Sequence, residues 1–229
     1  MRCDRRPTPG IAYADSARIE RHVERTIGRV DCVFHEIVSE RVHIDVLLVR
    51  ARPARPYHVL VTSGMSALPM PKPACGDPCL HAELVVLLPE HWPVDQKAWR
   101  DPRWYWPVRS LKAAARFPHE AGKFLSCGHT IEGGGATAGA GTPLTDIALL
   151  PSTSLPERSQ SFPHRLGRHV HLWAIWPLHR RETKYAVRKG TQALEERLLA
   201  AGVRDVVDPD RPCVVPRPRI GRTRRRPAP

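Results

Sequence analysis

Four extended apolar runs follow one another in the first part of the chain, at residues 32–38, 42–49, 57–62 and 80–88. In the second run, Ile44 and Val46 alternate with His43 and Asp45, a pattern typical of a strand with one buried face. The intervals between the first three runs are short, so antiparallel pairing of neighbours is the simplest topology. The run at 80–88 is almost wholly apolar and is predicted to be a buried strand that ends at Pro89.

Helical patterns are interspersed with further short strands in the rest of the chain. Helices are predicted from Asp15 to about Gly28, then at residues 95–102, 107–117, 182–189 and 191–201. Strands are predicted at residues 147–150 and 170–176, with a short edge strand at 203–207. Since strands and helices come in blocks, the order favours an α+β fold with a mixed or antiparallel sheet and helices packed beside it.

The composition is that of one folded domain with a basic tail. The chain has 229 residues, 41% of them hydrophobic, and a formal net charge of +13. Residues 1–11 are predicted to be a disordered N-terminus, residues 12–215 a single domain, and residues 216–229 a disordered tail with six arginines. The tail could make weak, non-specific contact with nucleic acid, and a nucleic-acid binder that acts through this Arg-rich tail stays open as an alternative function.

Membrane insertion and a disulfide scaffold are not expected. The longest apolar run is far shorter than the roughly 20 residues that span a bilayer, and the first residues lack the apolar core of a signal peptide. Six scattered cysteines are too few to staple a chain of this length, so reduced thiols are expected. These features predict a cytoplasmic protein.

Several segments, taken in order, resemble the bacterial members of the Suppressor of Fused family. They are FHEIVSERVHIDVLLV at residues 34–49, RPYHVLVTSGMSALPM at 55–70, AELVVLLPEHWP at 82–93, YWPVRSLKAAARFPHE at 105–120, GHTI at 128–131 and ALLP at 148–151. The resemblance implies a compact mixed α/β domain that binds rather than catalyses. Bacterial members are thought to include immunity proteins of polymorphic toxin systems, and animal members restrain a zinc-finger transcription factor.

The resemblance and the polar turn after residue 61 lead to a predicted partner-binding surface. We expect it to include Thr62, Ser63, Gly64, Met65, Ser66, His119, Glu120 and His129, together with the aromatic residues between 92 and 106. The predicted partner is a protein, in particular an acidic toxin domain, because a basic surface speeds association with an acidic partner. No catalytic residue, metal or cofactor is predicted.

Two groups of residues leave other functions open. His35, His43 and Asp45 could support a metal-assisted hydrolase, although they could equally hydrogen-bond one another on the polar face of a sheet. Cys75, Cys79 and His81 resemble half of a zinc site, but the second cysteine pair of a zinc ribbon is missing. The glycine-rich run at 133–141 lacks a phosphate-loop lysine and is predicted to be a flexible loop.

Overall fold

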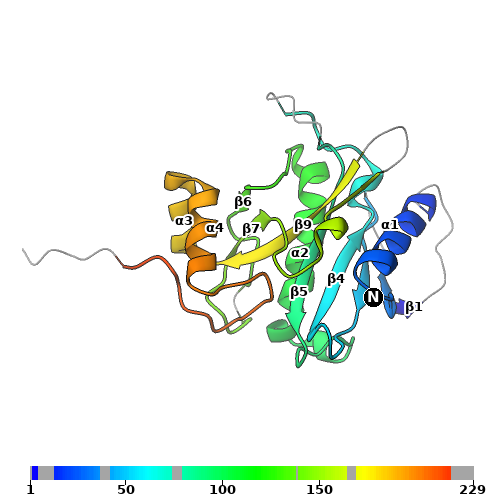
Figure 1. Ribbon diagram of the computed structural model, residues 1–229, viewed down its shortest axis with the longest axis horizontal. Helices are drawn as coiled ribbons and strands as arrows, with labels where there is room; N and C mark the ends of the chain where they lie inside the picture. Colours follow the sequence, from blue (N-terminus) through cyan, green and yellow to red (C-terminus); the bar gives the residue numbers. More distant parts are fainter. Residues whose placement is uncertain are drawn as a thin grey trace, which may run out of the picture.

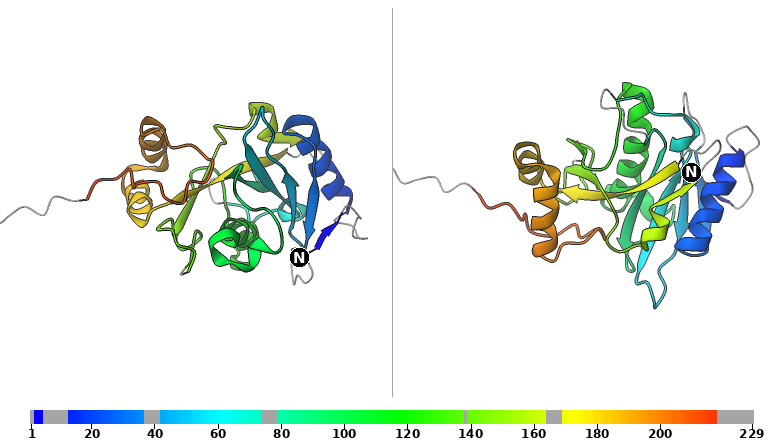
Figure 2. Two further views of the ribbon diagram at one scale, coloured as in Figure 1. Left: turned by 90° about the horizontal axis from the view of Figure 1, so that it is seen from below. Right: turned by 45° about the horizontal axis from the view of Figure 1, so that its top comes forward.

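A nine-stranded sheet organises the molecule, with helices packed on both of its faces (Figures 1 and 2). The computed structural model describes residues 2–4, 13–36, 42–73, 79–137, 139–163 and 169–217. Its strands are β1 (Arg2–Asp4), β2 (Cys32–His35), β3 (Asp45–Val49), β4 (Tyr57–Ser63), β5 (Ala82–Pro89), β6 (Thr130–Ile131), β7 (Asp146–Leu150), β8 (Ser161–Pro163) and β9 (His169–Leu178).

The strand order is β1-β2-β3-β4-β5-β9-β7-β6, and β8 pairs with β9. The predicted antiparallel pairing of the three early runs is confirmed, since β2 pairs with β3 and β3 with β4. β5 then pairs in parallel with β9, from Ala82 opposite His171 to Val85 opposite Ala174. The other described pairs are antiparallel, so the predicted α+β fold with a mixed sheet is also confirmed.

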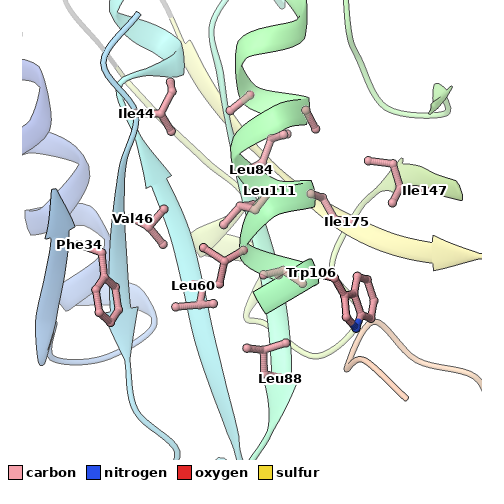
Figure 3. Packing of buried hydrophobic residues seen from close by; sticks show 14 of the residues in the cluster. Phe34, Ile44, Val46, Leu60, Leu84, Leu88, Trp106, Leu111, Ile147 and Ile175 are labelled. Carbon is pink, nitrogen blue, oxygen red and sulfur yellow. The ribbon is translucent and has the colours of Figure 1, made fainter. Parts of the chain in front are cut away.

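The helices are α1 (Tyr13–Thr26), α2 (Pro102–Ala121), α3 (Arg180–Lys189) and α4 (Thr191–Ala200), with single 3-10 turns at Met65–Ala67, Ala98–Arg100 and Glu157–Ser159. Alternate residues of β5 face opposite sides, because Leu84 and Leu88 belong to one buried cluster and Val85 and Leu87 to another. The first cluster lies under α2 (Figure 3), and the second includes side chains from α1, α3 and α4. This two-sided burial explains why the run at 80–88 is almost continuously apolar.

The prediction that a helix begins at Pro107 is wrong. α2 begins at Pro102, where the side chain of Asp101 accepts a hydrogen bond from the backbone N–H of Arg103, and it continues through Pro107 to Ala121. Pro107 removes one helical hydrogen bond, but Val108 and Leu111 are fully buried against the sheet. Packing of this face therefore keeps the helix continuous where the local sequence alone predicts a break.

Three further expectations differ from the structure. Within residues 1–11, where disorder is expected, Arg2–Asp4 forms an edge strand on β2; the remainder of that segment lies outside the described residues. The edge strand expected at 203–207 is reduced to a single bridge between Leu87 and Val206. Cys32 is disulfide-bonded, so the expectation of reduced thiols is wrong at that position.

The described helices include none with the length and apolar character needed to cross a membrane. Of the predicted tail, only residues 216 and 217 are described, and residues 218–229 lie outside the described residues.

A buried ion pair fastens the C-terminal segment to the start of α3. The Arg211 guanidinium donates to both carboxylate oxygens of Glu182, from Nη1 at 2.8 Å and from Nη2 at 2.6 Å. Glu182 also accepts from the backbone N–H groups of Val214 and His179. Burial alone would raise the pKa of Glu182, but the hydrogen bonds and positive charge of Arg211 outweigh it, so the pKa lies below its ordinary value.

Replacing Glu182 tests this ion pair. Glu182→Gln leaves the Arg211 charge buried and should lower the free energy of unfolding at pH 7 by about 3 kcal/mol. A carboxylate whose pKa is lowered by folding stabilises the fold fully above its unfolded pKa of about 4.3, and loses that contribution as pH falls through the folded pKa. Urea unfolding should therefore show the gap between wild type and variant closing as pH falls below about 4. The exposed Glu196→Gln serves as control, and a gap that does not change with pH would contradict the assignment.

Candidate functional site

The turn after β4, predicted to bind a partner, is built around the buried carboxylate of Glu83. Glu83 accepts four hydrogen bonds: from Thr62 Oγ1 (2.6 Å), the Gly64 N–H (3.0 Å), the Ser66 N–H (2.9 Å) and Ser66 Oγ (2.6 Å). Its side chain is 0% exposed, and burial raises its pKa above the ordinary value while the four hydrogen bonds oppose that shift. The carboxylate thus satisfies the donors in the buried part of the turn, which would otherwise lack partners.

The carbonyl groups of the same turn are held by two histidines. His119, near the end of α2, donates from Nε2 to the Met65 carbonyl at 3.0 Å, and His81 donates from Nδ1 to the Ser66 carbonyl at 2.9 Å. Burial lowers the pKa of His119, although its hydrogen bond to Met65 opposes that shift. Gly64 lies against β3: its φ is +134°, and a Cβ there would fall 1.9 Å from the His43 carbonyl oxygen. Both the hydrogen-bond donors and the carbonyl acceptors of the turn therefore have side-chain partners that fix its conformation.

The predicted binding residues differ in their exposure to solvent, and on this basis they form two groups. Thr62, Ser63, Gly64, Met65 and Ser66 are all buried, so their role in the described structure is to support the turn. The exposed part of the turn is Leu68 and Pro69. Glu120 and His129 are exposed, and His119 is half-buried. Contact with a partner stays a prediction for all eight residues.

The residues of the alternative hydrolase site come together as a hydrogen-bonded network. Asp45 lies 2.9 Å from His35 Nδ1 through Oδ2 and 2.9 Å from His43 Nε2 through Oδ1, and Oδ1 also accepts from the Glu36 N–H. Both Asp45 oxygens are therefore engaged by neighbours on the sheet. Within the described part of the chain, no group of three or more His, Cys, Asp or Glu side chains is arranged to hold a metal ion.

The expected half zinc site is also arranged differently. Cys75 lies outside the described residues, and His81 turns toward Ser66. Cys79 instead meets His171 of β9, with Sγ 3.2 Å from Nε2. The sequence gives no signal for this pair, because 91 residues separate its members and only the parallel pairing of β5 with β9 brings them together.

The aromatic residues between 92 and 106 mainly pack the core. Trp92 and Trp106 are almost fully buried, and their rings meet edge to face at 6.3 Å. Trp92 also donates from Nε1 to the carbonyl of Trp104, while Trp99 packs on Phe34. Pairs of this kind stabilise the attachment of α2 to the sheet. The buried rings of Trp92, Trp99 and Trp106 serve this packing, whereas Trp104 and Tyr105 are partly exposed, and partner contact by the aromatic residues stays a prediction.

An exposed apolar and basic region lies instead at α3, at the end of the molecule away from α1 (Figure 1). It consists of two hollows that share Val187 and Glu132, which we call the α3 surface. The first, about 580 Å³, is lined by apolar side chains from the end of α2, from β6 and from α3, including Phe117, Phe124, Ile131 and Val187, and also by His129. The second, about 400 Å³, is lined by Arg181, Lys184, Arg188 and Val215. Val187 is 72% exposed, a high value for a large apolar side chain.

A search of the sequence against protein families matches the family described as Suppressor of fused protein (SUFU) over residues 40–212, more than half of the chain. The chain belongs to the SUFU family. The matched segment contains the turn around Glu83, the end of α2 and the whole of α3. Among curated protein sequences, none is significantly similar to this SUFU member.

Solved structures share this SUFU fold at low sequence identity. A SUFU homologue from Neisseria gonorrhoeae is 14% identical with a TM-score of 0.61, and the match covers 88% of this chain and 97% of that one. A Sufu–Fu complex structure is 16% identical with a TM-score of 0.58, covering 91% and 93%. Drosophila Suppressor of Fused is 15% identical with a TM-score of 0.50, covering 75% of this chain and 42% of that one.

The carboxylate of Glu83 should be necessary for the turn. Glu83→Ala removes the acceptor of four hydrogen bonds from buried donors, so we expect the free energy of unfolding to fall by at least about 3 kcal/mol. Glu90→Ala, the same change just after the exposed end of β5, should cost less than about 0.5 kcal/mol. Chemical denaturation of both variants measures the difference, and equal losses would show that the Glu83 hydrogen bonds do not hold the turn.

Proposed function

We propose that this SUFU member is a non-catalytic protein-binding protein whose α3 surface docks an acidic segment of a protein partner. We propose further that the partner is a toxin domain, and that the chain acts as an immunity protein that masks it in the bacterial cytoplasm. Binding of this kind requires a complementary surface and no reacting group. The proposal therefore depends on the chemistry of the exposed side chains around α3.

The exposure of Val187 is the observation that carries the proposal. A large apolar side chain at 72% exposure, beside a hollow lined by Phe124 and Ile131, offers an apolar anchor point. When a partner removes such a site from water, the complex is stabilised by about 25 cal/mol per Å² of apolar area buried. Leu68, the other large apolar side chain that is exposed among the described residues, is 47% exposed and therefore offers less uncovered apolar area.

The charge around Val187 favours an acidic partner. Arg181, Lys184 and Arg188 line the second hollow, where Glu132 is the only acid, and Glu132 is already paired with Arg180 at 2.6 Å. Arg181 Nη1 is buried and has no hydrogen-bond partner among the described residues. A carboxylate on the partner would complement the positive charge of this basic rim.

The relatives and the predicted residues support the same interpretation. One relative was solved as a Sufu–Fu complex, and recognition of a protein by that relative makes protein binding the natural proposal for this chain.

His129 lines the first hollow and packs edge to face against Phe124 at 5.9 Å. The end of α2 connects the two predicted regions, since Phe117 lines the hollow and His119 holds the Met65 carbonyl. In this proposal His129 contacts the partner, and the turn keeps α2 in place.

Two matched substitutions test the surface. We expect Val187→Glu to weaken binding at least about thirtyfold, because it removes the apolar contact and places a negative charge opposite an acidic partner. Leu68→Glu makes the same change on the predicted turn and should leave the affinity within about twofold of wild type. Both positions are exposed, so both variants should keep the thermal midpoint of the wild type.

The assay is co-expression with the toxin domain encoded beside this chain, in cells that the toxin alone kills, followed by calorimetric titration of the purified pair. Rescue by wild type and Leu68→Glu but not by Val187→Glu supports the α3 surface. Loss of rescue only with Leu68→Glu would place the interface at the turn. If no neighbouring protein is neutralised or bound by the wild type, the immunity proposal fails.

A further inference from the structure

A thiol and an imidazole meet at the start of the parallel pair β5–β9, outside the α3 surface. Cys79 Sγ lies 3.2 Å from His171 Nε2, and Cys79 is a reduced thiol. Both residues are half-buried, so the pair is not fully enclosed by the fold. A thiol at hydrogen-bonding distance from an imidazole nitrogen can pass its proton to the ring, and the resulting thiolate is the nucleophilic form of cysteine.

The fold fixes the imidazole in place. His171 pairs with Ala82 across the parallel ladder, and its backbone N–H donates to the His81 carbonyl at 3.1 Å. Its ring stacks on Trp173, two residues along the same strand, with centroids 5.2 Å apart and planes 8° from parallel. Nε2 is therefore held toward the segment that carries Cys79, as expected for a base that is oriented by its surroundings.

The other two reduced thiols of the described residues have different surroundings. Cys127 is exposed, but partial burial of its sulfur and the nearby negative charge of Glu195 raise its pKa. Cys213 donates its S–H to the Val215 carbonyl at 3.5 Å. The structure thus supplies two internal reference thiols, and Cys79 differs from them in its contact with the His171 imidazole.

We propose that Cys79 and His171 form a reactive thiol site that exchanges with disulfides of low molecular mass. His171 Nε2 accepts the proton of Cys79 Sγ, and the thiolate attacks one sulfur of the disulfide. A new S–S bond forms to Cys79 as the original S–S bond breaks, and the released thiolate takes the proton back from the imidazolium. The products are a mixed disulfide at Cys79 and one small thiol: Cys79 is oxidised, and the small disulfide is the oxidant that is reduced.

The reaction can be followed with oxidised glutathione on the intact protein. After acid quenching, peptide mapping by mass spectrometry gives a separate rate for each cysteine. At about pH 6, we expect Cys79 to react at least about tenfold faster than Cys127, although Cys127 is the more exposed. We also expect the Cys79 rate to vary little between about pH 6 and pH 8, whereas an ordinary thiol gains about tenfold per pH unit there. A Cys79 rate that rises in parallel with that of Cys127 would overturn the proposal.

Removal of the imidazole gives a second test. His171→Gln should slow Cys79 about tenfold at about pH 6, and the deficit should vanish at about pH 9, where the thiol ionises without help. The Cys127 rate in the same sample reports whether the fold is intact, and it should not change. An equal loss at both pH values, with Cys127 unchanged, would show that His171 only shapes the site. If the variant does not fold, the pH profile of wild-type Cys79 decides the question by itself.

Discussion

Burial of the central strands on both faces is the constraint on which the rest of the structure depends. β5 runs through the middle of the sheet, with α2 over one face and side chains from α1, α3 and α4 over the other. No water reaches a polar group placed there, so each one requires an internal partner. Glu83 is the clearest case, because its carboxylate is the acceptor for the turn that leaves β4. The position of the turn, and through His119 the position of the end of α2, both follow from that requirement.

Because of the same constraint, the side chains that can react or contact another molecule lie at the ends of the sheet. The tryptophans near α2 and the histidines around Asp45 are occupied by packing and by hydrogen bonds. The side chains that remain accessible lie beyond the central strands, around α3 and where β5 and β9 begin. The proposed binding at α3 and the proposed thiol exchange at Cys79 therefore use separate parts of the molecule, and a substitution at one should leave the other unchanged.

The fold was largely predictable because its signals are local. The apolar runs that became β3, β4 and β5 and the break at Gly190 between α3 and α4 were read directly from side-chain patterns. The start of α2 could not be predicted in the same way, because the burial of Val108 and Leu111 outweighs the local effect of Pro107 on the helix. The candidate site was predicted less well. A polar Thr-Ser-Gly-Met-Ser sequence suggests an exposed turn, yet these residues are buried because they hydrogen-bond to the carboxylate of Glu83. The contact between Cys79 and His171 depends on the pairing of two strands that are far apart in the sequence.

The outer strands of the sheet are short. β1 spans three residues at one edge, and β6 spans two at the other. A long unpaired edge is a template on which another chain can add a strand through its backbone, whether as a ligand or as the first step of aggregation. An edge of two or three residues supplies too few backbone groups to hold an added strand in register. The proposed recognition of a partner would therefore depend on side chains rather than on an added strand. The same short edges disfavour edge-to-edge association of the folded chain.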